Sequence, residues 1–172
     1  MKQLKWIFVR YALATLAVFC SPFFYKIFRP ITYWLLFFFS SIFYNVSFNG
    51  NYLLVDSFSV ELVDACIAGS AYLLLLLLNL LTPKIKFHKR IFLFLVSSVM
   101  FLIINIFRLL VTIPFFGKNG FATIHITFWF ISIAFVVAIW FFCVRIFDLK
   151  EVPVYSDVKT ILKFLKSREK RE

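Results

Sequence analysis

The chain has 172 residues, of which 63% are hydrophobic and 22% are aromatic, including 26 phenylalanines. A soluble domain averages about 45–50% apolar residues, so this composition excludes an ordinary soluble protein and indicates a polytopic membrane protein. The formal net charge is +11, which in a soluble protein would suggest a nucleic-acid partner. Here the Lys and Arg residues cluster between and after apolar segments, which fits membrane orientation and anionic lipid instead. No nucleic-acid partner is expected.

Two apolar segments open the chain, at 6–25 and 31–44. Pro22 is expected to kink the first, and the two basic residues and the proline in 26–30 break the apolar pattern between the segments. The second segment is shorter than the roughly 20 residues that a helix needs to cross a bilayer. We interpret both as membrane spans, and the first as the weakest.

Residues 45–63 alternate apolar and polar positions over much of their length and contain no Lys or Arg. Asn49-Gly50 is a strong turn signal, since both residue types tolerate a positive φ. This pattern predicts a small β-hairpin, of two or three strands, outside the hydrocarbon.

Three more apolar segments follow, at 65–81, 91–113 and 124–147. Asp64 or a neighbour is a candidate N-cap of the first, and a proline follows each of the first two, as is common after helix ends. All five segments together predict an all-α polytopic membrane protein with about five transmembrane helices. These helices are expected to form a single domain over 1–150.

The remaining residues, 151–172, form a predicted basic cytoplasmic tail. Its apolar residues recur at helical spacing, and its lysines lie off that stripe: the apolar set is Val158, Ile161, Leu162 and Leu165, and the lysines are Lys159, Lys163 and Lys166. This pattern predicts a basic amphipathic helix on the membrane surface. A solvated charged tail is the alternative, because helices this short are marginal alone.

The positive charges predict an orientation. The basic loop 84–90 and the tail should be cytoplasmic, and these two assignments agree because two spans separate them. The segment 45–63 is then external, together with the loop between the last two spans. Counting spans backwards places the N-terminus outside, which Lys2, Lys5 and Arg10 oppose, so the first segment either spans against its charges or does not span.

Three polar residues on different predicted helices converge on the external membrane face. Cys66 lies at the start of its helix, Arg108 lies near the outer end of its own, and His125 lies at the start of the last span. Asn105 precedes Arg108 by three residues and therefore shares its helix face. The sequence thus predicts one site at one depth.

The residue types in this set can act together in one nucleophilic reaction. A helix N-terminus or a nearby cation favours the reactive thiolate of a cysteine, and Arg108 could supply that cation for Cys66, or could bind an oxyanion or carboxylate. His125 could carry a proton. Small residues that include Gly69 and Ser70 permit a neighbouring helix or a substrate backbone to approach closely.

Structural explanations exist for each residue taken alone. A cysteine within a span is commonly a small hydrophobe, and a histidine at an interface is commonly an anchor. Arg108 is close enough to the helix end to extend its charge toward water, although ionisable residues in spans usually mark function.

The order of these motifs resembles that of the exosortase/archaeosortase family of membrane cysteine transpeptidases, over residues 60 to 130. The family pairs an Ala-Cys-Ser-Gly-like motif with an Asn-x-x-Arg motif and a later His or Arg. Here the corresponding residues are Ala65-Cys66 with Gly69-Ser70, then Asn105-Ile-Phe-Arg108, then His125. One departure is that the glycine stands three residues after the cysteine rather than two.

The resemblance implies an enzyme with catalytic Cys66, Arg108 and His125, supported by Asn105, Asp64, Gly69 and Ser70. It implies a multi-pass protein of the cell membrane, with its active site on the external face. The implied substrates are secreted proteins that end in a sorting motif, a transmembrane helix and a basic end. The implied acceptor of the cleaved chain is an amine on a lipid.

No cofactor is expected, and no metal, because the chain lacks CxxC motifs and His/Cys clusters. Two other classes stay open. A small transporter or channel would carry a polar stripe through the full membrane depth, whereas the polar residues here lie at one end. A non-catalytic scaffold would use Cys66 only for packing, and a thiol-reactive probe would distinguish it.

Overall fold

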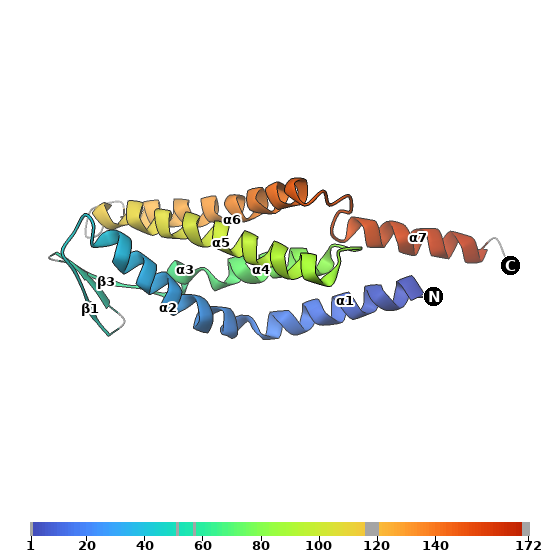
Figure 1. Ribbon diagram of the computed structural model, residues 1–172, viewed down its shortest axis with the longest axis horizontal. Coiled ribbons are helices and arrows are strands. Elements are labelled where there is room, and N and C mark those ends of the chain that lie inside the picture. The colour runs from blue at the N-terminus through green and yellow to red at the C-terminus, as the bar shows by residue number, and fades with distance from the viewer. Residues whose placement is uncertain (1, 51, 57, 116–120, 170–172) are drawn as a thin grey trace.

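The computed structural model describes residues 2–50, 52–56, 58–115 and 121–169. It is an elongated, mostly helical bundle with a small sheet at one end and both ends of the chain toward the other (Figure 1). The helices are α1 (Lys2–Phe19), α2 (Ser21–Ser40), α3 (Asp64–Ile67), α4 (Gly69–Leu81), α5 (Phe87–Thr112), the 3-10 turn η1 (Ile113–Phe115), α6 (Phe121–Ile146) and α7 (Tyr155–Glu169). Most of the loop predicted between α5 and α6 lies outside the described residues.

The β element between α2 and α3 is a sheet of three antiparallel strands in the order β1-β2-β3. The strands are β1 (Val46–Asn49), β2 (Tyr52–Val55) and β3 (Phe58–Glu61). Gly50, with φ +62°, follows β1 in the predicted turn, where a residue without a side chain is least strained. Leu53, Val55 and Val60 are buried toward the bundle. The predicted β element of two or three strands is therefore confirmed, and it has three strands.

The first two apolar segments form one bent pair of helices. α1 and α2 meet at a bend of 59°, next to Pro22, which occupies the first turn of α2 where a missing N–H costs little. The predicted kink thus exists, but the predicted break at 26–30 is wrong, because α2 continues through Pro30. The packing of α2 against α4 and α5 compensates for the one backbone hydrogen bond that Pro30 cannot make.

The described chain shows fewer candidate spans than the expected count of about five. Two helices, Phe87–Phe115 and Thr123–Ile146, are long and apolar enough to cross a membrane, and the bent pair α1–α2 makes a third if it counts as one span. α4 has only 13 residues, or about 20 Å at 1.5 Å per residue, which is shorter than a hydrocarbon core of about 30 Å.

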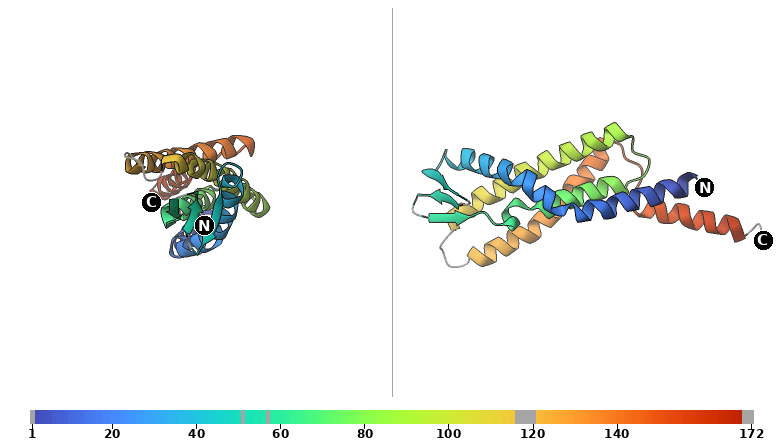
Figure 2. Two further views of the ribbon diagram at one scale, coloured as in Figure 1. Left: turned by 90° about the vertical axis from the view of Figure 1, so that its left-hand side faces the viewer. Right: turned by 90° about the horizontal axis from the view of Figure 1, so that it is seen from below.

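The N-terminal end of α1 lies beside α7, at the opposite end of the bundle from the sheet, in both side views (Figures 1 and 2). An ion pair between Arg10 and Asp157 joins the two helices. Because 6–25 and 31–44 run in the same direction, the placement of the N-terminus on the same side as 45–63 is wrong. The N-terminal basic residues share an end with the tail, which removes the conflict in the charge pattern.

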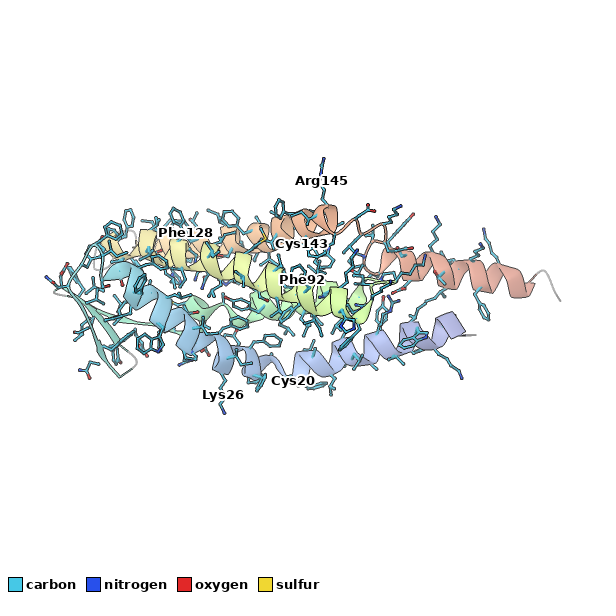
Figure 3. The ribbon with its side chains drawn as sticks, viewed as in Figure 1. Cys20, Lys26, Phe92, Phe128, Cys143 and Arg145 are labelled. Carbon is cyan, nitrogen blue, oxygen red and sulfur yellow. The ribbon has the colours of Figure 1, made fainter. Side chains whose placement is uncertain are left out.

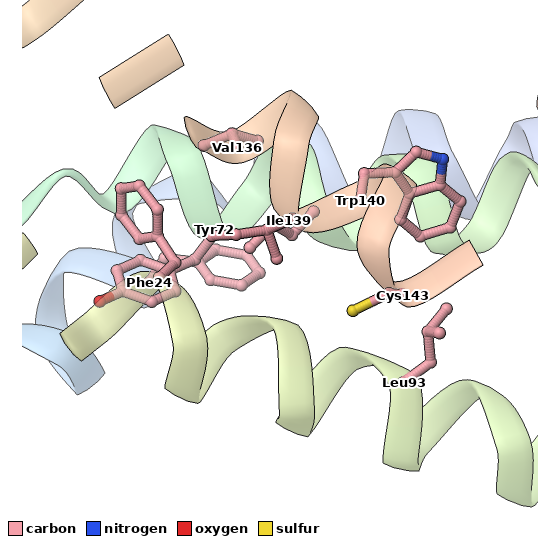
Figure 4. Close-up of a cluster of buried hydrophobic side chains, with 9 residues drawn as sticks. Phe24, Tyr72, Leu93, Val136, Ile139, Trp140 and Cys143 are labelled. Carbon is pink, nitrogen blue, oxygen red and sulfur yellow. The ribbon is translucent and has the colours of Figure 1, made fainter. Parts of the chain in front are cut away.

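Large apolar side chains cover the outer faces of the helices, including Phe92 (Figure 3), as expected for helices that face lipid. One buried cluster lies among α4, α5 and α6 and contains Tyr72, Phe101 and Trp140 (Figure 4). A second lies between the sheet, α2 and α5 and contains Cys66. The tail helix α7 is confirmed, and its Val158, Ile161 and Leu162 are exposed.

Candidate functional site

The segment that carries Cys66 is a single turn rather than the start of a long helix. α3 ends at Ile67, Ala68 adopts a left-handed conformation with φ 55° and ψ 41°, and α4 starts at Gly69. The N-cap of α3 is Val63, with no side-chain cap, so the prediction that Asp64 caps a helix over 65–81 is wrong. A helix this short has few aligned peptide dipoles, so Cys66 gains little from its N-terminus.

Asp64 instead forms an ion pair with Arg29 of α2, which ties α3 to that helix. Tyr33 of α2 donates a hydrogen bond to the carbonyl of Leu62, with 3.2 Å between the oxygens. α2 therefore fixes one side of the turn that carries Cys66.

Gly69 is one of the small residues predicted to allow close approach, and the structure confirms it. A Cβ on Gly69 would lie 2.8 Å from the ring of Tyr25, closer than side chains tolerate, so α2 and α4 meet there because the residue is glycine. Ser70 is exposed and lies outside the buried group around Cys66.

Helix α5 holds the other side of α3 through one hydrogen bond from a side-chain amide and one from a guanidinium. Asn105 donates from Nδ2 to the carbonyl of Cys66 at 2.9 Å, and Arg108 donates from Nη2 to the carbonyl of Ala65 at 3.1 Å. The three-residue spacing of Asn105 and Arg108 thus matches two consecutive carbonyls of α3. Asn105, Arg108 and Cys66 are 1%, 7% and 6% exposed, so this contact is an interior one.

The second contact of Arg108 reaches α6, at a residue that the sequence did not single out. Nη1 of Arg108 donates to Oγ of Ser132 at 3.3 Å, and Ser132 donates to the carbonyl of Phe128 at 2.8 Å. Arg108 and Ser132 border a groove between α5 and α6 whose other walls are apolar. A lone serine among phenylalanines gives no motif, so only packing could reveal it.

No carboxylate neutralises Arg108 in the described part of the chain. The ion pairs there are Arg10–Asp157, Arg29–Asp64 and Lys84–Glu151. A charge within a span without a counter-charge is costly and usually marks function, so Arg108 is the residue of this site that most needs an explanation.

His125 lies farther out than predicted. It precedes Ser132 by seven residues on α6, which is about 10 Å along a helix, and its ring lies against Phe121. Among the described residues it forms no hydrogen bond or ion pair with Cys66 or Arg108, although the charge of Arg108 acts on it electrostatically. The structure therefore brings Cys66, Asn105 and Arg108 together and leaves His125 apart.

Tyr72 is a second residue that sequence reasoning missed. It is completely buried, stacked on Phe28 with ring centroids 3.5 Å apart, and edge-on to Phe101 at 5.1 Å. Arg108 interacts electrostatically with both Cys66 and Tyr72. In the sequence this tyrosine simply precedes a run of leucines and looks like ordinary core.

The thiol needs activation in this setting. Burial raises the pKa of Cys66 above its ordinary value, and the positive charge of Arg108 opposes that rise. The arrangement can therefore hold a protected cysteine whose ionisation depends on one guanidinium. No cluster of three His, Cys, Asp or Glu residues suited to a metal ion occurs in the described ranges.

Comparisons with known protein families, with curated proteins and with solved structures found no match to this chain.

Proposed function

We propose that this protein is a membrane-embedded cysteine transpeptidase that resembles the exosortases and archaeosortases. The observation that carries the proposal is the pair of contacts from Asn105 and Arg108 to the carbonyls of Cys66 and Ala65. These contacts fix the backbone on both sides of the thiol and bring a cation to it, as a nucleophilic cysteine requires.

In the proposed reaction Cys66 attacks a peptide carbonyl of the substrate and forms a thioester. Arg108 favours the thiolate, and His125 carries the thiol proton to the leaving amine. Because His125 makes no direct contact with Cys66, this transfer runs through water or the bound substrate. An amine acceptor on a lipid then attacks the thioester and releases the acyl chain from Cys66.

The proposal places the protein in the cell membrane as a multi-pass protein, with the sheet and the site toward the external face. The substrates are secreted proteins with a C-terminal motif, an apolar span and a basic end. The support for this orientation is the charge pattern: the described N-terminal residues, the loop 84–90 and α7 share the end opposite the sheet (Figure 1), and basic residues favour the cytoplasmic side.

A second candidate is a non-catalytic membrane scaffold. The observation that favours it is that the hydrogen bonds of Arg108 go to a backbone carbonyl and to Ser132, as in a purely structural contact.

An acyl adduct on Cys66 tests the function. The protein is purified from cells of its own host in the presence of an amine scavenger, and Cys66 peptides are analysed by mass spectrometry before and after hydroxylamine, which cleaves thioesters. We expect a hydroxylamine-sensitive peptidyl adduct on Cys66 and none on Cys143, which is equally buried. Full processing by a Cys66→Ala variant, or the absence of any adduct, favours the scaffold.

A further inference from the structure

The groove between α5 and α6 brings two polar side chains, Arg108 and Ser132, together with apolar walls. It encloses about 380 Å³, which lies within the range of about 300–1,000 Å³ that is common for small-molecule sites. The apolar walls come from both helices and are formed by Ile103, Ile104, Phe107, Phe128, Ile131 and Phe135. A groove with one polar position and otherwise apolar walls suits an amphipathic ligand.

The polar position carries a positive charge that no carboxylate neutralises in the described ranges. Nη1 of Arg108 donates to Oγ of Ser132 at 3.3 Å and Nη2 donates to the carbonyl of Ala65 at 3.1 Å, and both acceptors are uncharged. The ion pairs of the described chain involve other residues. A guanidinium has five N–H donors, so donors remain for a ligand. A cation inside an apolar span is costly without a counter-charge, and an anion beside Arg108 would lower that cost.

The groove also has a direction relative to the membrane. α5 runs toward the sheet end (Figure 1), so the α5 wall from Ile103 to Phe107 lies on the side of Arg108 away from the sheet. The five residues from Arg108 back to Ile103 cover about 8 Å. Arg108 itself lies seven residues before the end of the apolar span Phe87–Phe115, about 10 Å from its sheet-side end. An amphipathic molecule with its charge at Arg108 therefore points its apolar part toward the bilayer centre, as a lipid does.

We propose that this groove binds a lipid with an anionic headgroup. The lipid phosphate accepts hydrogen bonds from the free donors of Arg108, whose planar fork matches phosphate oxygens, and one acyl chain lies along the apolar walls. Ser132 orients the guanidinium by accepting a hydrogen bond from Nη1. The inference goes beyond the proposed function, because it requires no reaction at Cys66.

A lipid fits the groove better than a protein helix does. Ile103 and Phe107 are 64% and 68% exposed, so this side of the bundle is open to the surrounding bilayer. A partner helix would have to carry its own carboxylate into the apolar layer, which is costly. An anionic lipid already holds its charge at the membrane interface and its chains in the hydrocarbon, and basic pockets between membrane helices bind such headgroups.

The test compares two lipids that differ in headgroup charge. The purified full chain in nonionic detergent is titrated with dioleoyl phosphatidylglycerol or dioleoyl phosphatidylcholine, and bound lipid is measured by native mass spectrometry. Phosphatidylcholine neutralises its phosphate with its own ammonium group, so it offers Arg108 no net charge. We expect phosphatidylglycerol to bind about 10- to 100-fold more tightly, as for one hydrogen bond to a charged group. Glycerol phosphate, an anion without acyl chains, should not bind detectably at the same concentrations.

Matched pairs of variants locate the site. Ile131→Trp fills the groove with a larger side chain, whereas Ile133→Trp places the same ring at an exposed position of α6 that does not line the groove. Binding of phosphatidylglycerol should weaken about 10-fold or more in Ile131→Trp only, since about two CH₂ groups that lose burial account for that much. Arg108→Gln should abolish the preference for phosphatidylglycerol. Arg145→Gln, at an exposed arginine that points away from the bundle (Figure 3), should keep it.

Both isoleucines are exposed, so that pair decides the question even if Arg108→Gln does not fold. Equal affinities of Ile131→Trp and Ile133→Trp for phosphatidylglycerol overturn the inference, and so does equal binding of the two lipids by the wild type. Tight binding of glycerol phosphate would reduce the groove to an anion site and overturn the lipid assignment. A dimer that Ile131→Trp alone dissociates would overturn it as well, and would assign the groove to a second copy of this chain.

The adduct experiment on Cys66 tests the proposed function separately. An adduct on Cys66 together with equal binding of the two lipids would remove the lipid site and leave the transpeptidase. A preference for phosphatidylglycerol that Ile131→Trp abolishes, without any adduct on Cys66, would leave the lipid site in a non-catalytic scaffold.

Discussion

Each end of the bundle contains an arginine turned into the protein, and the two arginines are bound very differently. Arg90, near the start of α5 at the end opposite the sheet, donates to the carbonyls of Ile85, Asn79, Leu80 and Thr82. Arg108, toward the sheet end of the same helix, donates to one carbonyl and one hydroxyl.

The difference separates a structural arginine, Arg90, from an arginine available for function, Arg108, on the same helix α5. Arg90 occupies the carbonyls that the end of α4 leaves without intrahelical partners, a common use of a basic side chain. Arg108 is more buried, has fewer partners, and lies beside Asn105, whose Oδ1 has no hydrogen-bond partner in the described chain. An arginine that satisfies its surroundings stabilises the fold, whereas one left incompletely satisfied is available to a substrate.

The two ends should be accessible from opposite sides of the membrane, and this all-or-none effect is the largest we expect. In a chain whose three cysteines are replaced by alanine, single cysteines at Ser47, Lys5 and Lys163 are treated with an impermeant maleimide on intact cells. Ser47→Cys should react, and Lys5→Cys and Lys163→Cys should react only after permeabilisation. Reaction at Lys5 without permeabilisation would separate the N-terminus from the tail and contradict the bent α1–α2 pair.

Replacement of Arg108 should mainly remove reactivity. Arg108→Lys keeps a charge but loses the planar fork that reaches Ala65 and Ser132 together, so Cys66 acylation by p-nitrophenyl butyrate should fall about 10²- to 10³-fold. Arg90→Lys is the matched control and should acylate normally in the molecules that stay folded. Equal losses of acylation in both variants would show that the two arginines do the same work.

Replacement of Arg90 should mainly remove stability. Arg90→Met leaves the carbonyls at the end of α4 without donors, and each such loss costs about 1–3 kcal/mol when no water replaces the donor. We expect a clear fall in the unfolding midpoint of the detergent-solubilised protein, larger than that of Arg108→Met. A larger fall for Arg108→Met would make Arg108 the structural arginine and favour the scaffold.

A methyl group at Gly69 tests how tightly α2 and α4 meet beside the site. The Cβ of Gly69→Ala would enter the Tyr25 ring, and such overpacking costs about 1–3 kcal/mol. Ser70→Ala, at the exposed neighbouring position, should stay within about 0.5 kcal/mol of the wild type. Similar unfolding midpoints for the two variants would mean that the close approach is not rigid.

The smallest effect is expected at the exposed Lys84–Glu151 pair. The hydrogen bond from Lys84 lowers the pKa of Glu151, so its contribution is present above the unfolded-state value and is lost as the pH falls through the lowered folded value. Glu151→Gln should cost less than about 1 kcal/mol, measured by thermal unfolding at neutral pH. The difference from the wild type should shrink in acid, and a constant difference would exclude an ionic origin.

The local sequence determined several features because each depends on near neighbours. Apolar content indicated the membrane class, Asn49-Gly50 predicted the turn, and tail periodicity predicted α7. The spacing of Asn105 and Arg108 likewise placed them on one helix face, whatever that helix packs against. These features require no knowledge of which helices meet.

Only the tertiary structure decided the rest. The direction of α2 could not be read from charge, because counting alternating spans assumes a reversal at 26–30 that the helix does not make. Ala68 is an ordinary helix former in sequence, and its left-handed conformation exists because contacts from α2 and α5 fix α3. Ser132 reached Arg108 for the same reason: contacts between helices far apart in sequence depend on how whole helices pack, which no short window of residues encodes.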